Sequence, residues 1–307
     1  MLVENKSIAI VLQKHRVWHL KATLLQTNST AFAKLFHVRR NTDAIITKIN
    51  TKKSTNMNIA LIGYGKMGHM IEDVALQRGH QVVCKIDVDN QNDFDSEAFA
   101  KADVAIEFTS PSTAYNNVKK AFEHNVKVVS GSTGWFEEHR DELTTLCEKE
   151  GKTLFWASNF SVGVAIFAAL NKRLAQLMNG FPQYDCVIEE THHVHKKDAP
   201  SGTAITLADE IVKQLDRKKQ WKKGLLITEE GVTEPDCTFT TSDLPIDSIR
   251  LGEENGTHTI AYDSEEDSIT ITHSAHSRKG FALGAVLAAE YTQQNTGLLG
   301  INNLFNF

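Results

Sequence analysis

The chain has 307 residues and a formal net charge of −5 at pH 7, a length that favours two domains. Residues 1–56 contain ten lysines and arginines against two acidic residues, whereas residues 57–307 contain 23 against 36. An acidic body argues against nucleic acid as a partner, and no apolar run is long enough to span a membrane.

Two features bear on where the protein works. Its four cysteines are scattered without C-x-x-C spacing, which is typical of reduced thiols in a cytoplasmic protein and not of a disulfide framework or a zinc site. The basic segment 1–56 lacks glycine and proline, so we expect a disordered N-terminal extension, or an over-extended reading frame, ahead of a body that starts at Met57. A transit peptide is the alternative, and it would place the protein in a plastid.

A glycine-rich loop follows the first strand of the acidic body. Residues 58–62 form a short apolar run, and a helical pattern occupies residues 69–77. In this strand, loop and helix context, G-x-G-x-x-G allows a tight turn, close passage of a pyrophosphate and close packing of the helix on the strand. A purely structural turn is the alternative. The expected cofactor loop consists of Gly63, Tyr64, Gly65, Lys66, Met67 and Gly68.

The next strand bears on the identity of the cofactor. Residues 81–86 form an apolar run that ends at Asp87, where an acid accepts hydrogen bonds from the adenosine ribose. Val88 follows in place of an arginine, so a 2′-phosphate would meet the Asp87 carboxylate uncompensated. The pattern favours NADH over NADPH, although Lys66 or Lys85 can soften the discrimination.

Small and polar residues recur at the ends of the later strands. Strand patterns at residues 102–108, 126–130 and 154–156 alternate with a helical pattern at residues 112–125. Open α/β sheets bind ligands at the carboxyl ends of their strands, although ordinary turn chemistry explains each residue taken singly. We therefore predict a Rossmann-type parallel sheet in a dinucleotide-binding domain, residues 57–160. The candidates for the nicotinamide half of its site are Gly131, Ser132, Thr133, Ala157, Ser158, Asn159 and Phe160.

The run E-E-T-H-H-V-H-K-K-D-A-P-S-G-T-A, residues 189–204, combines three imidazoles with two ammonium groups and a helix start. Histidine has the side-chain pKa nearest neutrality and suits a proton donor, while lysine suits a carboxylate or phosphate. The first helix amides, at Gly202 and Thr203, would face an anion. A solvated loop is one alternative. A metal site is another, but His192 and His195 show no helical spacing and no other ligand lies at a suitable offset.

A second domain, residues 161–276, is expected to bind substrate and form oligomers. Its helix at residues 203–215 precedes five β-branched, alternating runs, which predict an α+β domain with an open, largely antiparallel or mixed sheet. These runs cover residues 225–228, 238–241, 246–250, 257–262 and 268–273. A last helix, residues 280–291 within the segment 277–307, is rich in small residues and is expected to pack back on the nucleotide domain.

Together these segments resemble a known family. The run at residues 189–204 is similar to the signature of 4-hydroxy-tetrahydrodipicolinate reductase, also called dihydrodipicolinate reductase, of the diaminopimelate and lysine pathway. The segments G-Y-G-K-M-G, E-F-T-S-P, G-S-T-G and A-S-N-F-S-V-G resemble the cofactor-side motifs of that family in the same order, over about residues 57–295. The resemblance implies an NAD(P)H-dependent oxidoreductase that reduces a small cyclic dicarboxylate imine, and a homotetramer built through the second sheet.

The resemblance also implies roles for individual residues. His192 would donate or accept the proton, Lys196 would be the second catalytic group, and His193 with the Gly202 and Thr203 amides would contact substrate. Gly63 to Met67, Asp87 and the strand-end candidates would line the dinucleotide. This chain departs from the family in its compact glycine loop, where many members carry an extra residue, and at Val88, where an arginine often follows the ribose acid. Both departures concern the use of NADPH and not the reaction.

Two other functions share the glycine loop. A different Rossmann-type dehydrogenase of small carbonyl or amino-acid substrates would have no need of His192, His193 and Lys196 beside the Gly202–Thr203 turn. A non-catalytic dinucleotide sensor would bind NADH without consuming it. The sequence assigns His195 no role beyond orienting its neighbours, and Arg278 is either a ligand contact or a plain charge beside the last helix.

Overall fold

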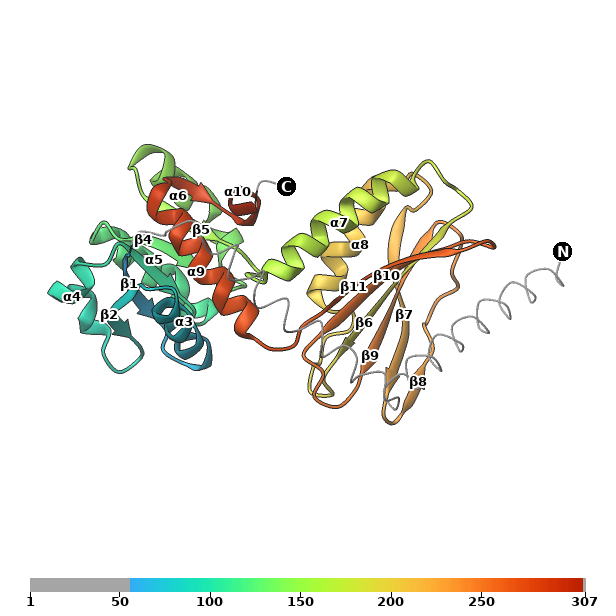
Figure 1. The fold of residues 1–307 in the computed structure, drawn as a ribbon, viewed down its shortest axis with the longest axis horizontal. Coiled ribbons are helices and arrows are strands. Elements are labelled where there is room, and N and C mark those ends of the chain that lie inside the picture. The colour runs from blue at the N-terminus through green and yellow to red at the C-terminus, as the bar shows by residue number, and fades with distance from the viewer. Residues whose placement is uncertain (1–55, 306–307) are drawn as a thin grey trace. The chain divides into compact units, whose positions relative to one another are not determined.

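The computed structural model describes residues 56–305, and these form two six-stranded sheets with helices packed on them (Figure 1). The predictions for the basic N-terminal segment therefore lie, apart from its last residue, outside the described residues. Within residues 56–305, no helix is both long enough and apolar enough to cross a lipid bilayer.

The first sheet is entirely parallel and has the order β12-β5-β4-β3-β1-β2. Its strands are β1 (Asn58–Ile62), β2 (Gln81–Ile86), β3 (Val104–Glu107), β4 (Lys127–Ser130), β5 (Thr153–Trp156) and β12 (Gly297–Leu299). Its helices are α3 (Lys66–Gln77), α4 (Glu97–Ala100), α5 (Pro111–Glu123), α6 (Phe136–Lys149), α9 (Lys279–Gln294) and α10 (Ile301–Phe305), with a 3-10 turn η1 (Gln91–Asp95). Because the strands are parallel, the carboxyl ends of β1 to β5 meet at one edge of the sheet.

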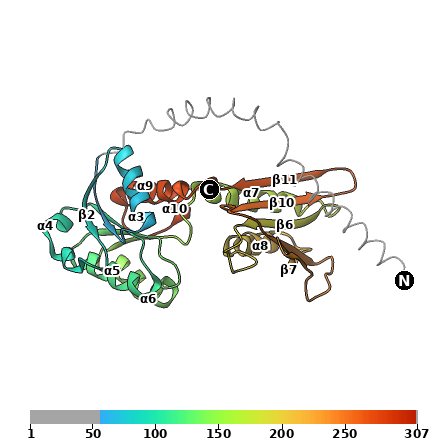
Figure 2. The same cartoon turned by 90° about the horizontal axis from the view of Figure 1, so that it is seen from below.

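Two apolar cores cover the two faces of this sheet. Successive strand residues point to opposite faces, so Ala60 and Ile62 of β1 pack with α5 and α6, while Ile59 and Leu61 pack with α3 and α9. Figure 2 shows these helix pairs on opposite sides of the sheet. The alanine-rich face of α9 lies in the second core, and the chain then adds β12 at the sheet edge beside β5. The segment 277–307 thus contains a strand and a short helix in addition to the expected helix.

The second sheet is mixed, with the order β11-β10-β6-β9-β7-β8. Its strands are β6 (Asp185–His192), β7 (Gln220–Thr228), β8 (Gly231–Thr233), β9 (Asp243–Arg250), β10 (Thr257–Asp263) and β11 (Ser268–Ser274). β9 pairs in parallel with both β6 and β7, and the other three pairings are antiparallel. Helices α7 (Val162–Met178) and α8 (Gly202–Gln214) bury apolar side chains against one face of the sheet. The predicted fold class, a Rossmann-type sheet with a second α+β domain, is confirmed.

One predicted strand is wrong. Residues 238–241 alternate like a strand, but the chain there forms no strand. The buried Asp243 carboxylate accepts hydrogen bonds from the Thr240 amide, at 2.8 Å, and from the Thr240 hydroxyl, also at 2.8 Å. These bonds bend the backbone into a turn ahead of β9, so local side-chain contacts override the β propensity of the threonines.

Candidate active site

The glycine loop packs as its three glycines require. Gly63 has φ +92°, and a Cβ there would lie 2.1 Å from the Phe108 carbonyl oxygen. A Cβ on Gly68 would lie 2.4 Å from the Gly63 carbonyl oxygen, whereas a Cβ on Gly65 would meet no atom within 4 Å. The outer glycines therefore permit close backbone packing, and Gly65 leaves open space before the N-terminus of α3, where a pyrophosphate fits.

Asp87 lies at the carboxyl end of β2 and is tied to this loop. Its Oδ2 accepts a hydrogen bond from the Tyr64 amide at 3.0 Å, and its Oδ1 accepts one from the Val88 amide at 2.9 Å. The carboxylate is half-buried and no side-chain cation is bonded to it within the described chain. These contacts place an acid beside the first turn of the loop, as ribose recognition needs.

A cationic side chain near Asp87 is already paired. Lys85 Nζ lies 2.6 Å from Glu72 Oε1, donates to the Tyr64 hydroxyl at 3.0 Å, and sits 4.5 Å from the centre of the Tyr64 ring. The Tyr64 hydroxyl also donates to Glu72. The hydrogen bond that Lys85 donates to Glu72 is the largest cause that raises the pKa of Lys85. Lys85 is therefore held as a cation by Glu72 and Tyr64, while Lys66 is exposed.

The strand-end residues predicted to line the nicotinamide differ in exposure. Thr133 and Ser158 are exposed, and Asn159 uses its Oδ1 to accept from the Ser161 amide at 2.8 Å. Ala157 and Phe160 are buried, and the Phe160 ring packs on Phe108. Met67 is half-buried among the apolar residues of the α3 and α9 core. The structure thus brings all the candidates to the same edge but gives the buried ones packing roles.

Sequence reasoning missed a buried carboxylate at this edge. Glu107, at the end of β3, is 0% exposed and accepts hydrogen bonds from Ser130 Oγ at 2.5 Å and Ser132 Oγ at 2.8 Å. It also accepts from the Thr109 amide at 2.9 Å. Ser132 is therefore engaged in holding β3 and β4 together. A Cβ on Gly131 would lie 2.1 Å from the Phe108 ring, so that residue is small for packing reasons.

The histidine run straddles a strand and a helix start. Residues Glu189 to His192 are the last four of β6, and α8 begins at Gly202. Ser201 caps that helix, because its Oγ accepts a hydrogen bond from the Ala204 amide at 3.2 Å. The Ala204 amide is thus bonded to the capping side chain. The Gly202 and Thr203 amides precede it and face outward from the helix N-terminus. Between strand and helix, the Lys196 amide donates to the His193 carbonyl at 3.1 Å, which turns the chain back on itself.

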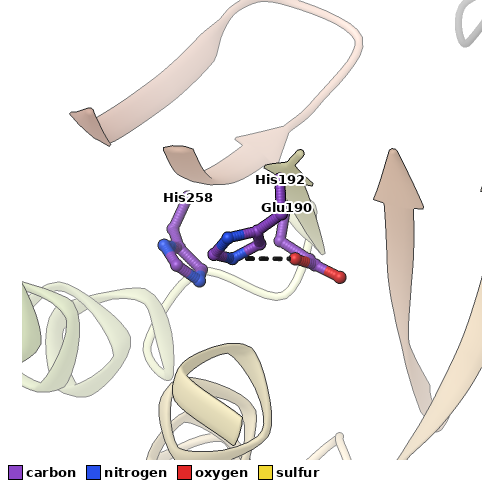
Figure 3. Close-up of side chains that lie close together, drawn as sticks. All are labelled: Glu190, His192 and His258. Carbon is purple, nitrogen blue, oxygen red and sulfur yellow. Dashed lines mark ion pairs between the residues drawn. The ribbon is translucent and has the colours of Figure 1, made fainter. Parts of the chain in front are cut away.

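His192 lies above a fully buried carboxylate. Its Nε2 is 3.2 Å from Oε2 of Glu190, which is 0% exposed, although neither atom makes a hydrogen bond of standard geometry (Figure 3). The ring of His258, from the neighbouring strand β10, stands edge-on to it with centroids 5.3 Å apart. On the other side, a Cβ on Gly256 would come within 2.8 Å of His192 Cε1. The imidazole is thus confined on several sides.

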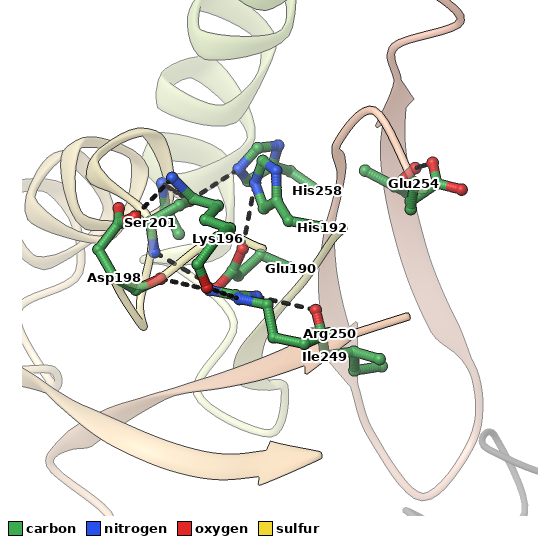
Figure 4. A network of polar contacts seen from close by, with 11 residues as sticks. Glu190, His192, Lys196, Asp198, Ser201, Ile249, Arg250, Glu254 and His258 are labelled. Carbon is green, nitrogen blue, oxygen red and sulfur yellow. Dashed lines mark hydrogen bonds and ion pairs between the residues drawn. The ribbon is translucent and has the colours of Figure 1, made fainter. Parts of the chain in front are cut away.

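Positive charge surrounds this imidazole. Arg250 Nη2 lies 2.8 Å from Glu190 Oε1, and Lys196 Nζ lies 2.8 Å from Asp198 Oδ1 (Figure 4). Burial lowers the pKa of His192, the charge of Glu190 raises it, and the charges of Lys196 and Arg250 lower it further. The net direction is downward, so His192 is largely neutral near pH 7 in the free protein, beside cations able to hold an anion.

The other two histidines of the run differ in environment. His193 is half-buried, and its Nδ1 has no hydrogen-bond partner among residues 56–305. His195 is 72% exposed and lies 3.2 Å from Glu253. The structure assigns His195 this exposed pair, which adds little stability, and a ring contact with His193 at a centroid distance of 6.0 Å. Arg278, at the N-cap of α9, is exposed.

Three donor groups lie close enough to share a metal ion. Glu190, His192 and His258 each offer an atom within 4.8 Å of the others. His258 lies 66 residues beyond His192 along the chain, so no local spacing indicates it as a third ligand, and only the pairing of β10 with β6 brings it beside them. The donor types suit zinc, but the Arg250 guanidinium already occupies the Glu190 carboxylate and opposes a dication. We therefore interpret the cluster as a proton-handling site.

His258 should make the free energy of unfolding depend on pH. The residue is 5% exposed, and burial, followed by the charges of its neighbours, lowers its pKa to about 3. The unfolded pKa is about 6.5, so folding favours the neutral ring: this stability is complete above that pH and is lost as the pH falls toward 3. Relative to His258→Asn, the wild type should lose about 1.5–2 kcal/mol between pH 6.5 and 5.

Urea unfolding of both proteins at the two pH values measures this difference. His195→Asn serves as the matched control, because its exposed ring should leave the curve unchanged. Parallel pH curves for the wild type and His258→Asn would contradict the neutral, buried state assigned to His258.

Two family models match this chain and together cover most of it. They are Dihydrodipicolinate reductase, N-terminus, over residues 57–160, and Dihydrodipicolinate reductase, C-terminus, over residues 163–305. The chain is also 43% identical over 250 residues to the 4-hydroxy-tetrahydrodipicolinate reductase of Christiangramia forsetii, covering 81% of this chain and 98% of that relative. It is 33% identical over 265 residues to the enzyme of that name from Neisseria meningitidis, covering 84% and 93%.

A solved structure has a similar fold. The dipicolinate-bound dihydrodipicolinate reductase from Paenisporosarcina sp. TG-14 superposes with a TM-score of 0.62 at 22% identity, covering 82% of this chain and all of that one. At this identity the likeness bears on the fold alone.

Proposed function

The chain belongs to the dihydrodipicolinate reductase family, and from that membership we propose how its residues divide the reaction. It catalyses the NAD(P)H-dependent reduction of 4-hydroxy-tetrahydrodipicolinate in diaminopimelate and lysine biosynthesis. The observation that carries our assignment is the position of His192, beside Glu190 and close to Lys196 and Arg250.

The glycine loop and Asp87 fit a dinucleotide, whose bound nicotinamide supplies a hydride. As charge builds on the reduced ring, His192 delivers a proton to it. The amides of Gly202 and Thr203 and the Lys196 ammonium hold a ring carboxylate, and His193 adds a polar contact. The negative charges of the bound substrate raise the pKa of His192 toward 7. The imidazole therefore takes up a proton when the substrate binds.

We propose that NADH is preferred over NADPH. The adenosine ribose would face the Asp87 carboxylate, and a 2′-phosphate would be repelled by it. The nearby Lys85 cannot offset this repulsion freely, since Glu72 and Tyr64 hold its ammonium group. Glu72 thus acts as a specificity residue through Lys85.

Glu72→Gln should release Lys85 and raise the use of NADPH. One freed cation near the ribose is worth about 1 kcal/mol in water, so the ratio of kcat/KM for NADPH to that for NADH should rise about fivefold. Steady-state kinetics with both cofactors measures the ratio, and adding Lys85→Met to the first change should return it to the wild-type value. An unchanged ratio in Glu72→Gln would contradict the role of Glu72.

The activity itself is tested by coupling. The substrate is unstable as a reagent, so the preceding synthase generates it in the cuvette, and NADH oxidation is followed by absorbance. Oxidation that depends on the synthase product supports the assignment. Tight binding of NADH without consumption would instead indicate a sensor, and oxidation only with other carbonyl substrates would indicate a different dehydrogenase.

We also propose a cytoplasmic homotetramer. Support for the compartment comes from the four free cysteines, three of which are buried. Support for the assembly comes from the family resemblance and from the second sheet, on which α7 and α8 bury only one face. The mass in solution, measured by light scattering, tests the assembly.

A further inference from the structure

A single buried ion pair contacts both proposed catalytic elements. Glu190 is 0% exposed and its Oε1 lies 2.8 Å from Arg250 Nη2 and 3.3 Å from the Ser201 amide that donates to it. Its other oxygen, Oε2, faces His192 Nε2 at 3.2 Å. One carboxylate therefore links the imidazole, the guanidinium and the residue that caps α8.

Arg250 extends the same connection to the lysine loop. Its Nη2 also donates to the Asp198 carbonyl at 2.5 Å, and its Nε donates to the Lys196 carbonyl at 3.3 Å. The side chain is 5% exposed, and its Nη1 donates to the Ile249 carbonyl at 2.8 Å. A planar guanidinium with five donors is suited to hold several acceptors in fixed directions, which an ammonium group cannot do.

Strand register brings these groups together. In the β6 and β9 pairing, His192 lies opposite Arg250, and in the β6 and β10 pairing, Glu190 lies opposite His258. Residues two apart on a strand share a face, so Glu190 and His192 point the same way from β6, as Figure 4 shows. Glu189 directly precedes Glu190 on β6, so by the same alternation it points to the other face.

We propose that Glu190 and Arg250 are positioning residues for the reduction: Glu190 orients His192 and supports its protonated form, and Arg250 holds the Lys196 loop against it. The inference rests on the proposed function of His192 and Lys196. The positive charge of Arg250 compensates the negative charge of the buried Glu190 carboxylate. Glu190 can therefore stay ionised where it faces the imidazole.

The charges around His192 determine whether each substitution raises or lowers its pKa. From β6 it faces Glu190, from β9 Arg250, from β10 His258, and from the loop after β6 it faces His193 and Lys196. Of these, only Glu190 raises the pKa of His192, and the cations lower it. Removing the Glu190 charge should therefore lower that pKa further, whereas an exchange of Arg250 for lysine should leave it nearly unchanged.

The first test is Glu190→Gln, which keeps the size and the acceptor for Ser201 and removes the charge. The pH at which kcat/KM begins to fall should shift down by about one unit, so kcat/KM at pH 7.5 drops about tenfold and recovers toward the wild-type value in acid. Glu189→Gln, on the opposite face of β6, is the matched control and should leave that pH unchanged. A loss in Glu190→Gln that is equal at every pH, or no loss, would overturn the role of Glu190.

The second test is Arg250→Lys. The lysine keeps the charge but cannot donate hydrogen bonds to the Lys196 and Asp198 carbonyls and to Glu190 at the same time. We therefore expect KM for the ring substrate to rise about tenfold and kcat to fall. The pH profile of kcat/KM should not shift. Arg217→Lys is the matched control, because Arg217 also donates to two carbonyls, those of Met178 and Tyr184. Equal behaviour of the two variants would overturn the role of Arg250.

Two measurements of the variants and a third substitution keep the outcomes distinct. Circular dichroism and NADH binding by fluorescence establish that each variant is folded and holds the cofactor. His192→Gln separates the proposals: if that variant keeps wild-type kcat, the proposed function of His192 fails, whereas a large loss there with an unshifted pH profile in Glu190→Gln defeats the positioning role alone.

Discussion

Replacing His192 with glutamine lowers kcat by about 10²–10⁴ and changes KM for the ring substrate little, because a positioned acid acts mainly in the transition state. Glutamine fills a similar volume beside Glu190 and His258 but has no proton to deliver at neutral pH. The loss should therefore appear in the chemical step. The measurement is the single-turnover rate at which bound NADH is oxidised at saturating substrate.

His195→Gln is the matched control for this variant. His195 belongs to the same run but is 72% exposed and paired with Glu253, so its loss should leave kcat within about twofold. Unchanged kcat in His192→Gln, or an equal loss in both variants, would contradict the role of His192 as the proton donor.

Replacing Lys196 with methionine should damage both kinetic parameters. The Lys196 ammonium would bind a ring carboxylate in the ground state and stabilise the negative charge that develops during hydride addition. Loss of one such electrostatic contact costs about 10²–10³ in kcat, and the lost binding should raise KM about tenfold. Steady-state kinetics with saturating NADH measures both values.

Lys197→Met is the matched control, because Lys197 is the exposed neighbour in the same run. It should leave kcat and KM near the wild-type values. A rise of KM in Lys196→Met with unchanged kcat would reduce Lys196 to a binding residue, and equal effects of the two substitutions would show that only net positive charge matters.

Much of the first domain could be predicted from local sequence. The positions of Gly63, Gly65 and Gly68 reflect contacts within one strand, loop and helix unit, and the structure places a tight turn, open space and close packing at those three positions. Asp87 follows the next strand directly, so its place beside the loop could also be predicted. The buried position of Glu107 could not, because its partner Ser130 lies on another strand, β4, and its partner Ser132 lies in the loop after that strand.

Predictions for the second domain were less complete. The alternation at residues 238–241 indicated a strand, but the Asp243 carboxylate draws Thr240 into a turn. The parallel pairing of β9 with β6 and β7 carries no local signal, because hydrophobic alternation is the same in parallel and antiparallel strands of a half-covered sheet. The pattern therefore predicted β7, β9, β10 and β11, but it did not predict β6 or β8 and left the strand order open.

The sequence by itself determined the family, the glycine loop and the side chains of the histidine run, since each depends on residues adjacent in the chain. Only the tertiary structure decided what surrounds His192. Arg250 and His258 lie 58 and 66 residues beyond it along the chain, and they reach it because β9 and β10 pair with the two edges of β6 in one register. A shift of that register by one residue would turn these side chains to the other face of the sheet, so long-range backbone hydrogen bonding fixes the charges at the site.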